Sequence, residues 1–361
     1  MGGVHSGSVV AHERFPPLPM RGRRDRRTAR GSGGSRGAAG ARYHSAPPSP
    51  HLQSRKQPSL MRFPFTGVIA VDKPRGVSSR RVVDGVAKAL GMRAVGHAGT
   101  LDPIASGVVV VCVGHATKLI DFLHALPKRY VGVFLLGRSS PSDDTELPVQ
   151  LEESPLQPAR EAVEQALAAF RGPIMQRPCD FSAVHVDGKR AYDLARRGRP
   201  VEIAAKPVTI HRLEVPEYAW PRLVLEVECS TGTYIRAIGR DLAAALGTTA
   251  VMDGLVRTAV GPFSQSAAVA LDRITGADAV DVASAWLQPA RAAVPHLPAV
   301  SLTPELVEHA ARGGILERSL AAAEHSDSEA IAAVAGDGTL IGILRPHRDG
   351  WRVRPNFVGR S

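Results

Sequence analysis

One glycine-rich segment holds an acidic side chain in an unusual setting. Residues 96–107 read Gly-His-Ala-Gly-Thr-Leu-Asp-Pro-Ile-Ala-Ser-Gly. The three glycines permit backbone geometry that other residues resist, and Pro103 directs Asp102 away from helical geometry and toward an extended one. The carboxylate of Asp102 is therefore expected on a tight loop at the mouth of a buried strand, which makes it a candidate for catalysis. An Asx turn that only shapes the loop is the alternative.

Other kinds of chemistry lack the residues that they need. The three cysteines, at positions 112, 179 and 229, lie too far apart for a Cys-x-x-Cys metal site, and their odd number argues against a disulfide framework. The longest apolar run, residues 108–113, fits a buried strand and is far shorter than the roughly 18 residues of a membrane-spanning helix. We therefore expect a soluble, intracellular protein without a structural metal.

Most of the positive charge lies near the N-terminus. Residues 1–60 contain ten Arg and one Lys against one Glu and one Asp, a net charge of +9 out of +11, which leaves +2 for the rest. This Arg-, Gly-, Ser- and Pro-rich segment cannot bury enough apolar surface to order itself, so disorder is predicted. It could be a basic arm that touches RNA, a transit peptide, or an extension upstream of a true start at Met61.

The elements that must position Asp102 begin at residue 63. A buried strand at residues 67–71 ends in Asp72-Lys73-Pro74, and a helix capped by Ser78 or Ser79 runs to Leu90, with Gly91 as its stop. Further strands are predicted at residues 107–113, 130–136 and 223–227, helices at residues 117–125, 159–170 and 233–246, and an exposed loop at residues 138–157.

The pattern changes after about residue 295. A helix at residues 304–312 is followed by strands at residues 330–334, 340–344 and 351–358, with Asp337-Gly338 as a hairpin turn. Strands and helices mix without strict alternation, which favours an α+β fold over a doubly wound parallel sheet. The predicted organisation is a disordered basic extension (1–62), a catalytic domain (63–295) and a small strand-rich domain (296–361).

Five stretches in order along the chain resemble the motifs of the TruB family of tRNA pseudouridine synthases. They span most of residues 66–263. They are Gly-His-Ala-Gly-Thr-Leu-Asp-Pro-x-Ala-x-Gly at 96–107, Asp72-Lys73-Pro74 with Gly76 and Ser78, Lys128-Arg129-Tyr130, Phe181-Ser182-Ala183 with Gly188-Lys189-Arg190-Ala191-Tyr192, and the segment from Cys229 to Arg236. The resemblance implies the pseudouridine synthase fold, with a central mixed, mainly antiparallel sheet flanked by helices, and a PUA-like C-terminal domain.

The resemblance also implies a reaction, the isomerisation of a uridine in the T-loop of tRNA, usually at position 55. The base must leave the stack before its glycosidic bond can be cleaved and re-formed through C5. Asp102 matches the family's catalytic aspartate, which attacks the ribose C1′ or the uracil C6, or promotes a glycal route. A glycosidase would need a second carboxylate, whereas here uracil can leave as an anion and stay trapped in a dry pocket.

Two further residues match the family's catalytic positions. Arg236 matches the arginine that pairs with the aspartate and keeps it ionised and oriented; an ordinary surface arginine on the helix is the alternative. Tyr130 matches the tyrosine that stacks on the flipped base. A proton-transfer role would require a lowered pKa of its phenol, and simple packing at a strand start is the alternative.

Four residues match substrate-binding positions. Tyr234 and Leu255 match residues that line the uracil pocket, with core packing as the alternative for Leu255. His97 matches a histidine that takes the place of the extruded base, since an imidazole is flat enough to stack there. Lys73 supports the motif loops or meets a phosphate, with a surface lysine as the alternative.

Basic residues elsewhere could follow the RNA backbone. These are Lys189, Arg190, Arg196, Arg197 and Arg199, and, at a strand end of the C-terminal domain, Arg345, His347 and Arg348. Solvated charged faces are the alternative. The likeness of the C-terminal domain to the family's RNA-binding domain is an analogy at the level of fold.

The sequence departs from the family pattern at several positions. Ser140-Pro141-Ser142-Asp143-Asp144 stands where Thr-Asp-Thr-x-Asp is common, His185 replaces a lysine, Cys179 replaces a proline, and residues 248–251 read Thr-Thr-Ala-Val instead of Cys-Gly-Ala-His. We expect these changes to lie away from Asp102, Tyr130 and Arg236.

Three hypotheses about function follow. The first is a monomeric, cytoplasmic synthase that acts on the T-arm of tRNA without metal, nucleotide, organic cofactor or obligate protein partner. In the second, the same chemistry is targeted by a guide RNA in a multiprotein particle; the short, weakly basic C-terminal domain favours the first. The third is a tRNA-folding chaperone whose catalysis is dispensable or lost.

Overall fold

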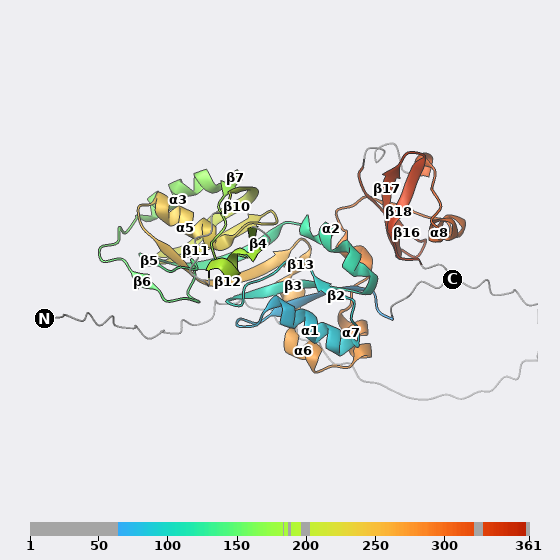
Figure 1. Ribbon diagram of the computed structural model, residues 1–361, viewed down its shortest axis with the longest axis horizontal. Helices are drawn as coiled ribbons and strands as arrows, with labels where there is room; N and C mark the ends of the chain where they lie inside the picture. Colours follow the sequence, from blue (N-terminus) through green and yellow to red (C-terminus); the bar gives the residue numbers. More distant parts are fainter. Residues whose placement is uncertain (1–63, 183, 187–188, 196–202, 321–327, 359–361) are drawn as a thin grey trace, which may run out of the picture. The chain divides into compact units, whose positions relative to one another are not determined.

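The protein was analysed as a computed structural model that describes residues 64–182, 184–186, 189–195, 203–320 and 328–358. It has an α+β fold, as predicted, with one large mixed sheet and a separate strand-rich sheet near the C-terminus (Figure 1). The predicted disordered extension, residues 1–62, lies outside the described residues. None of the helices in the described part of the chain is long and apolar enough to cross a bilayer.

The large sheet has ten strands in the order β14-β1-β3-β12-β4-β11-β10-β7, with β2 added to β3 and β13 added to β12. Most neighbours are antiparallel, but β1–β14 and β3–β12 are parallel. The strands are β1 (Gly67–Lys73), β2 (Val95–His97), β3 (Ala105–Val113), β4 (Lys128–Leu136), β7 (Gly172–Gln176), β10 (Lys206–Ala219), β11 (Arg222–Cys229), β12 (Ala250–Val260), β13 (Phe263–Ser264) and β14 (Val269–Ala270).

Helices pack on different parts of this sheet. In Figure 1, α1, α6 and α7 lie together beside β1–β3, whereas α5 packs on β4 and β12. The α-helices before residue 300 are α1 (Ser79–Leu90), α2 (Ile120–His124), α3 (Arg160–Ala166), α4 (Ala191–Ala195), α5 (Ile235–Ala245), α6 (Leu271–Thr275) and α7 (Ala279–Trp286). The 3-10 helices are η1 (Gly114–Leu119), η2 (Leu167–Phe170), η3 (Gln265–Ala267), η4 (Ala290–Ala293) and η5 (Arg318–Leu320).

Helix α1 follows the prediction closely. Ser78 is its N-cap, and the Ser78 hydroxyl accepts a hydrogen bond from the backbone N–H of Arg81 at 3.2 Å. Gly91 ends the helix in the left-handed conformation, at φ 63°. Two other predicted helices are partly 3-10: residues 117–125 begin in η1 and continue as α2, and residues 159–170 begin in α3 and end in η2.

The predicted exposed loop at residues 138–157 is partly wrong. It contains the short pair β5 (Arg138–Ser139) and β6 (Gln150–Leu151), and between these strands the chain turns inward. Ser142 is 3% exposed and Asp144 is 1% exposed. Polarity alone predicts exposure, but these side chains are buried because they face polar partners inside the protein.

The C-terminal sheet has the order β15-β16-β17-β18. Its elements are β15 (Ala299–Ser301), α8 (Pro304–Ala311), β16 (Ile331–Val334), β17 (Leu340–His347) and β18 (Gly350–Asn356). Three strands and the helix were predicted, and β15 was not, because it is only three residues long. Gly338 has φ 83° in the turn between β16 and β17, as the Asp-Gly pair indicates. A last pair, β8 (His185–Val186) and β9 (Lys189–Arg190), lies outside both sheets.

Helix α5 approaches the sheet very closely at Gly239. A Cβ atom added there would lie 2.1 Å from Cε1 of Phe134, a fully buried residue of β4. Glycine therefore fixes the distance between α5 and the sheet, and with it the position of every side chain that α5 directs toward the sheet.

Gly239→Ala is expected to lower the free energy of unfolding by about 1–3 kcal/mol, because the new methyl group overlaps the Phe134 ring. Urea denaturation measures the loss. Gly336→Ala is the control, since its Cβ would meet nothing within 4 Å, and it should change stability by less than about 0.5 kcal/mol. Equal effects of the two substitutions would contradict the close packing of α5.

Candidate active site

The Asp102 loop, residues 98–104, joins β2 to β3 and is held from several sides. The N–H of Ala105 donates to the carbonyl of Asp102 at 3.0 Å, and the N–H of Gly76 donates to Pro103 O at 2.7 Å. The Ser79 hydroxyl accepts from the N–H of Leu101 at 2.8 Å and donates to its carbonyl at 3.0 Å. The loop is therefore fixed by the connection between β1 and α1, and the Asp102 side chain remains 39% exposed.

Glycines around this loop are required for two different reasons. Gly99 and Gly107 have φ 109° and 100°, a region that side chains rarely adopt. At Gly107 a Cβ would also lie 2.3 Å from the carbonyl oxygen of Arg257. Gly96 has no positive φ, and there the limit is a close approach of Ile120 at 3.0 Å.

Asp102 lies against Arg236. The Arg236 Nη2 is 2.9 Å from Oδ2 of Asp102. This is the only hydrogen bond to that carboxylate from the residues that the structure describes. Arg236 itself is 6% exposed, so the surface-arginine alternative is wrong. The guanidinium therefore fixes Oδ2 of Asp102, and because the carboxylate is planar, this contact also limits the direction of the other oxygen.

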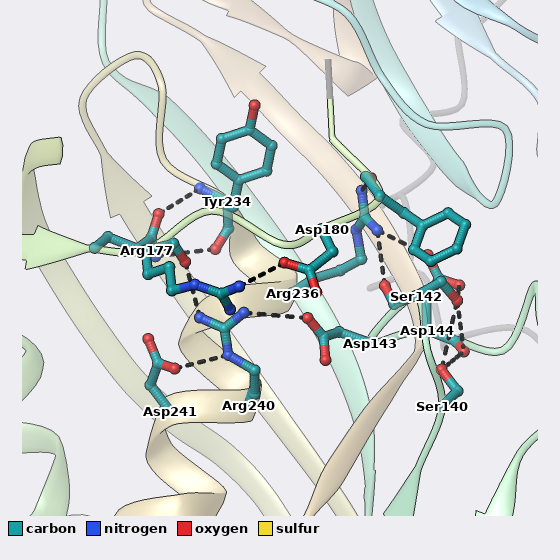
Figure 2. A network of polar contacts seen from close by, with 12 residues as sticks. Ser140, Ser142, Asp143, Asp144, Arg177, Asp180, Tyr234, Arg236, Arg240 and Asp241 are labelled. Carbon is teal, nitrogen blue, oxygen red and sulfur yellow. Dashed lines mark hydrogen bonds and ion pairs between the residues drawn. The ribbon is translucent and has the colours of Figure 1, made fainter. Parts of the chain in front are cut away.

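Arg236 has three further acceptors inside the protein. Its Nη1 donates to Ser142 O at 2.8 Å and lies 3.3 Å from Asp144 Oδ2, and its Nη2 donates to Phe181 O at 3.0 Å (Figure 2). Burial acts to lower the pKa of Arg236, but the carboxylates of Asp102 and Asp144 outweigh it, so the pKa is raised. The guanidinium stays charged, and a carboxylate stands on each side of it.

The expectation that the departures from the family pattern lie away from the catalytic residues is wrong for part of them. Ser142, which departs from the pattern, contacts Arg236 through its backbone carbonyl, and Asp144, which keeps the aspartate of the pattern, contacts it through its carboxylate. Cys179 is fully buried, and the charge of Arg236 acts on its thiol, whose pKa is nevertheless raised by burial. The Thr248 side chain does not bond to Arg236; its hydroxyl donates to Glu152 at 2.9 Å. His185 forms part of β8.

Tyr130 lies on β4, next to β12 and β11, where it pairs with Arg257 and Val227. It is half-buried. Burial raises the pKa of its phenol, while Arg257 acts to lower it and the charge of Asp102 acts to raise it. The phenol is thus protonated at neutral pH and lies within electrostatic range of Asp102.

Tyr234 and Leu255 approach the same region from different elements. Tyr234 is the N-cap of α5, and the Gln176 side chain holds it by accepting from its N–H at 2.8 Å and donating to its carbonyl at 3.1 Å. Burial raises the pKa of its phenol, and the charge of Asp102 adds to the rise. Leu255 is 8% exposed on β12 and pairs with Ala105 at the end of the Asp102 loop.

His97 is the last residue of β2 and is half-buried. Its Nδ1 is buried without a hydrogen-bond partner among the described residues. Burial, and then the charge of Arg257, lower the pKa of this imidazole. The ring is therefore neutral at pH 7.

Lys73 does not lie at the surface, so the surface-lysine alternative is wrong. It is 0% exposed, and its Nζ donates to Val77 O at 2.6 Å, to Pro74 O at 3.1 Å and to Ala105 O. With its donors used by backbone carbonyls, it has no access to a phosphate. Lys73 instead ties the segment after β1 to the end of the Asp102 loop.

Sequence reasoning missed Arg257 and Asp144. Arg257 is 1% exposed; its Nε donates to Val108 O at 2.6 Å and its Nη2 to Gly99 O at 3.0 Å, so it holds the Asp102 loop against β3. Its signal is a single charged residue inside the mostly apolar segment at residues 255–260. The signal for Asp144 is its match to the last aspartate of the pattern Thr-Asp-Thr-x-Asp, which the local polarity of the loop obscured.

The predicted RNA-contacting groups remain predictions. Arg196, Arg197 and Arg199 lie outside the described residues, and Lys189 and Arg190 form β9. In the C-terminal sheet, Asp349 lies 3.7 Å from His347 and 3.0 Å from Arg348. Part of the positive charge at that strand end is thereby balanced.

Known proteins resemble this chain in sequence and in structure. The sequence model of the N-terminal domain of TruB family pseudouridylate synthases matches residues 87–235. A tRNA pseudouridine synthase B of Ruegeria pomeroyi is 38% identical over 282 residues, covering 78% of this chain and 92% of the relative. One of Arthrobacter sp. is 40% identical over 294 residues, with the same coverage.

A solved structure gives the same fold. An archaeal box H/ACA sRNP Nop10–Cbf5 complex superposes with a TM-score of 0.60 at 21% identity, covering 82% of this chain and 87% of that chain. The sequence matches place the chain in the class of pseudouridine synthases, which are isomerases. Within that class, it belongs to the TruB family, and the resemblance inferred from the five motifs is confirmed.

Lys73→Met is expected to lower the free energy of unfolding by about 2–5 kcal/mol, because buried carbonyls lose a charged donor. Urea denaturation measures this loss. Lys88→Met on the exposed face of α1 is the matched control and should cost less than about 0.5 kcal/mol. A Lys73→Met protein as stable as the control would show that Lys73 does not support the loop.

Proposed function

We propose that the protein isomerises a uridine in the T-loop of tRNA, at position 55, to pseudouridine. The observation that carries the proposal is the position of Asp102, half exposed and fixed at 2.9 Å by Arg236. The TruB relatives, named tRNA pseudouridine synthase B, support tRNA as the substrate.

The reaction exchanges one bond for another without loss of atoms. The bond between the ribose C1′ and N1 of uracil breaks, the base turns, and a bond forms between C1′ and C5. The proton on C5 leaves and N1 gains a proton. Asp102 assists by attack on C1′ or C6, or by promoting a glycal, and the Asp102 site supports each of these routes.

The residues around Asp102 suit an everted base. Tyr130 offers a ring for stacking, and its raised pKa makes its hydroxyl a donor at neutral pH instead of a base. Tyr234 and Leu255 supply further walls near the Asp102 loop. Where these side chains and the bound RNA exclude water, return of the uracil is favoured over hydrolysis.

The proposed enzyme works as a cytoplasmic monomer, without a guide RNA or an obligate protein partner. Its catalytic domain is residues 63–295, and the PUA-like domain at 296–361 adds RNA contacts. The relatives that this chain covers to 92% are named as tRNA enzymes, which supports this choice. A guide-dependent enzyme or a chaperone without catalysis are the alternatives that the first experiment separates.

Asp102→Asn should bind an unmodified tRNA transcript as the wild type does but form pseudouridine about 10⁴-fold more slowly or not at all, because an amide is a poor nucleophile and base. Purified protein and bare transcript suffice, with chemical mapping at position 55 and a filter-binding assay. A wild type that needs added RNA or protein would favour guide dependence. Wild-type turnover by Asp102→Asn would end the assignment.

His97→Ala should weaken tRNA binding by about 5- to 100-fold, since one stacking contact is worth about 1–3 kcal/mol. His97→Phe should retain affinity. Because the pKa of His97 is lowered from 6.5, the imidazole is mainly neutral above that pH, and its contribution to wild-type affinity should stay constant between pH 6.5 and 8. Equal losses in the alanine and phenylalanine variants would contradict a stacking role.

A further inference from the structure

A second arginine–aspartate pair lies directly behind Arg236. Arg240 is four residues further along α5, so both arginines lie on the same face of the helix. Asp143 and Asp144 are adjacent in the chain, and each pairs with one arginine: Asp144 with Arg236 at 3.3 Å, and Asp143 with Arg240 at 3.2 Å (Figure 2).

The two arginines bridge the same two chain segments. Arg236 joins residues 142–144 to Phe181, through Ser142 O and Phe181 O. Arg240 joins Asp143 to Arg177, four residues before Phe181, because the Arg177 carbonyl accepts a hydrogen bond from Nη2 of Arg240 at 2.8 Å. Its Nε is held by Asp241 at 2.8 Å. The outer pair therefore repeats the connection of the inner pair one helical turn away.

The backbone of Asp143 is adapted to this arrangement. Its φ is 58°, the single positive value of a non-glycine residue in the described part of the chain. Successive side chains of an extended segment point in opposite directions, so two adjacent carboxylates cannot both face one helix unless the chain turns. The left-handed conformation supplies that turn, and Asp is among the residues that tolerate it.

Burial separates the roles of the two pairs. The Arg236 and Asp144 side chains are 6% and 1% exposed, whereas those of Arg240 and Asp143 are 23% and 20% exposed. Cys179 is fully buried beside them, and Asp143, Arg236 and Arg240 all act on its thiol. Burial keeps that thiol neutral, so it does not compete for either guanidinium.

We propose that the Asp143–Arg240 pair is a positioning clamp, which holds Asp144 on Arg236 and thereby sets where Arg236 meets Asp102. The effect of this clamp on the reaction rests on the proposed function. Among the contacts described, Arg240 bonds to Asp143, Asp241 and Arg177, and not to Asp102. Its role is positioning, not catalysis.

Single-turnover pseudouridine formation by the full chain on a tRNA transcript tests the clamp. Asp143→Asn keeps a residue that accepts the left-handed backbone but removes the charge, and Arg240→Gln removes the partner. Each should slow the reaction about 3- to 30-fold while tRNA affinity stays within twofold. The double variant should be no slower than the slower single variant, because both remove the same interaction.

Arg222→Gln is the matched control. Arg222 pairs with Glu217 at 2.8 Å and has a similar exposure, 25%, but it lies at the turn between β10 and β11. The Arg222→Gln variant should react at the wild-type rate, and the rate of Arg240→Lys should lie between those of Arg240→Gln and the wild type. Unchanged rates in the clamp variants, a parallel loss of affinity, or effects that multiply in the double variant would overturn the proposal.

A second measurement does not depend on activity. The Arg236 guanidinium, held by acceptors on both Nη atoms, should give slowly exchanging Nη resonances in ¹⁵N NMR, assigned by their loss in Arg236→Lys. Arg240→Gln and Asp143→Asn should broaden or shift these signals, and Arg222→Gln should not. Unaltered signals would refute the clamp, whether or not the wild type forms pseudouridine. A wild type that forms no pseudouridine would refute the proposed function alone.

Discussion

A buried guanidinium cannot lose its charge, and this constraint governs the site around Arg236. Leaving such a charge unpaired costs several kcal/mol, and arginine stays protonated under all ordinary conditions. The protein therefore surrounds Arg236 with two carboxylates and two backbone carbonyls. Every element that supplies one of these acceptors must be placed correctly before Asp102 can be oriented.

The rest of the fold places those acceptors through close backbone contacts. Gly239 lets α5 approach β4, which sets the height of Arg236 above the sheet. On the other side, Lys73 and Arg257 fix the Asp102 loop by donating to carbonyls of Ala105, Gly99 and Val108. Lys73 and Arg257, two buried cations, thus position the loop, and a third, Arg236, pairs with Asp102. The site is rigid because its backbone is held by charged donors, which bind carbonyls more strongly than neutral donors do.

Much of this arrangement could be predicted from the sequence, and the part that could not has a physical cause. Helix α1 has a serine cap, an apolar face and a glycine stop, and all three signals are local. Asp102 and Arg236 were found because their motifs are distinctive, although 134 residues separate them. Asp144 was placed in an exposed loop, because local polarity does not reveal a buried partner on a helix that lies far ahead in the chain. For Lys73, the sequence left support of the loops, a phosphate contact and a surface position open, because its carbonyl acceptors are brought together only by the fold.

The second carboxylate on Arg236 has a purpose that does not depend on the chemical route. If Asp102 attacks C1′ or C6 it becomes an ester, and if it takes a proton on the glycal route it becomes a neutral acid. In each case Asp102 gives up its negative charge while Arg236 keeps its positive one. Were Asp102 the sole counter-ion, the intermediate would contain a buried, unpaired guanidinium, and the cost would add to the barrier. Asp144 lies 3.3 Å from the guanidinium and is 1% exposed, so the proposed reaction of Asp102 would still leave a carboxylate group beside Arg236.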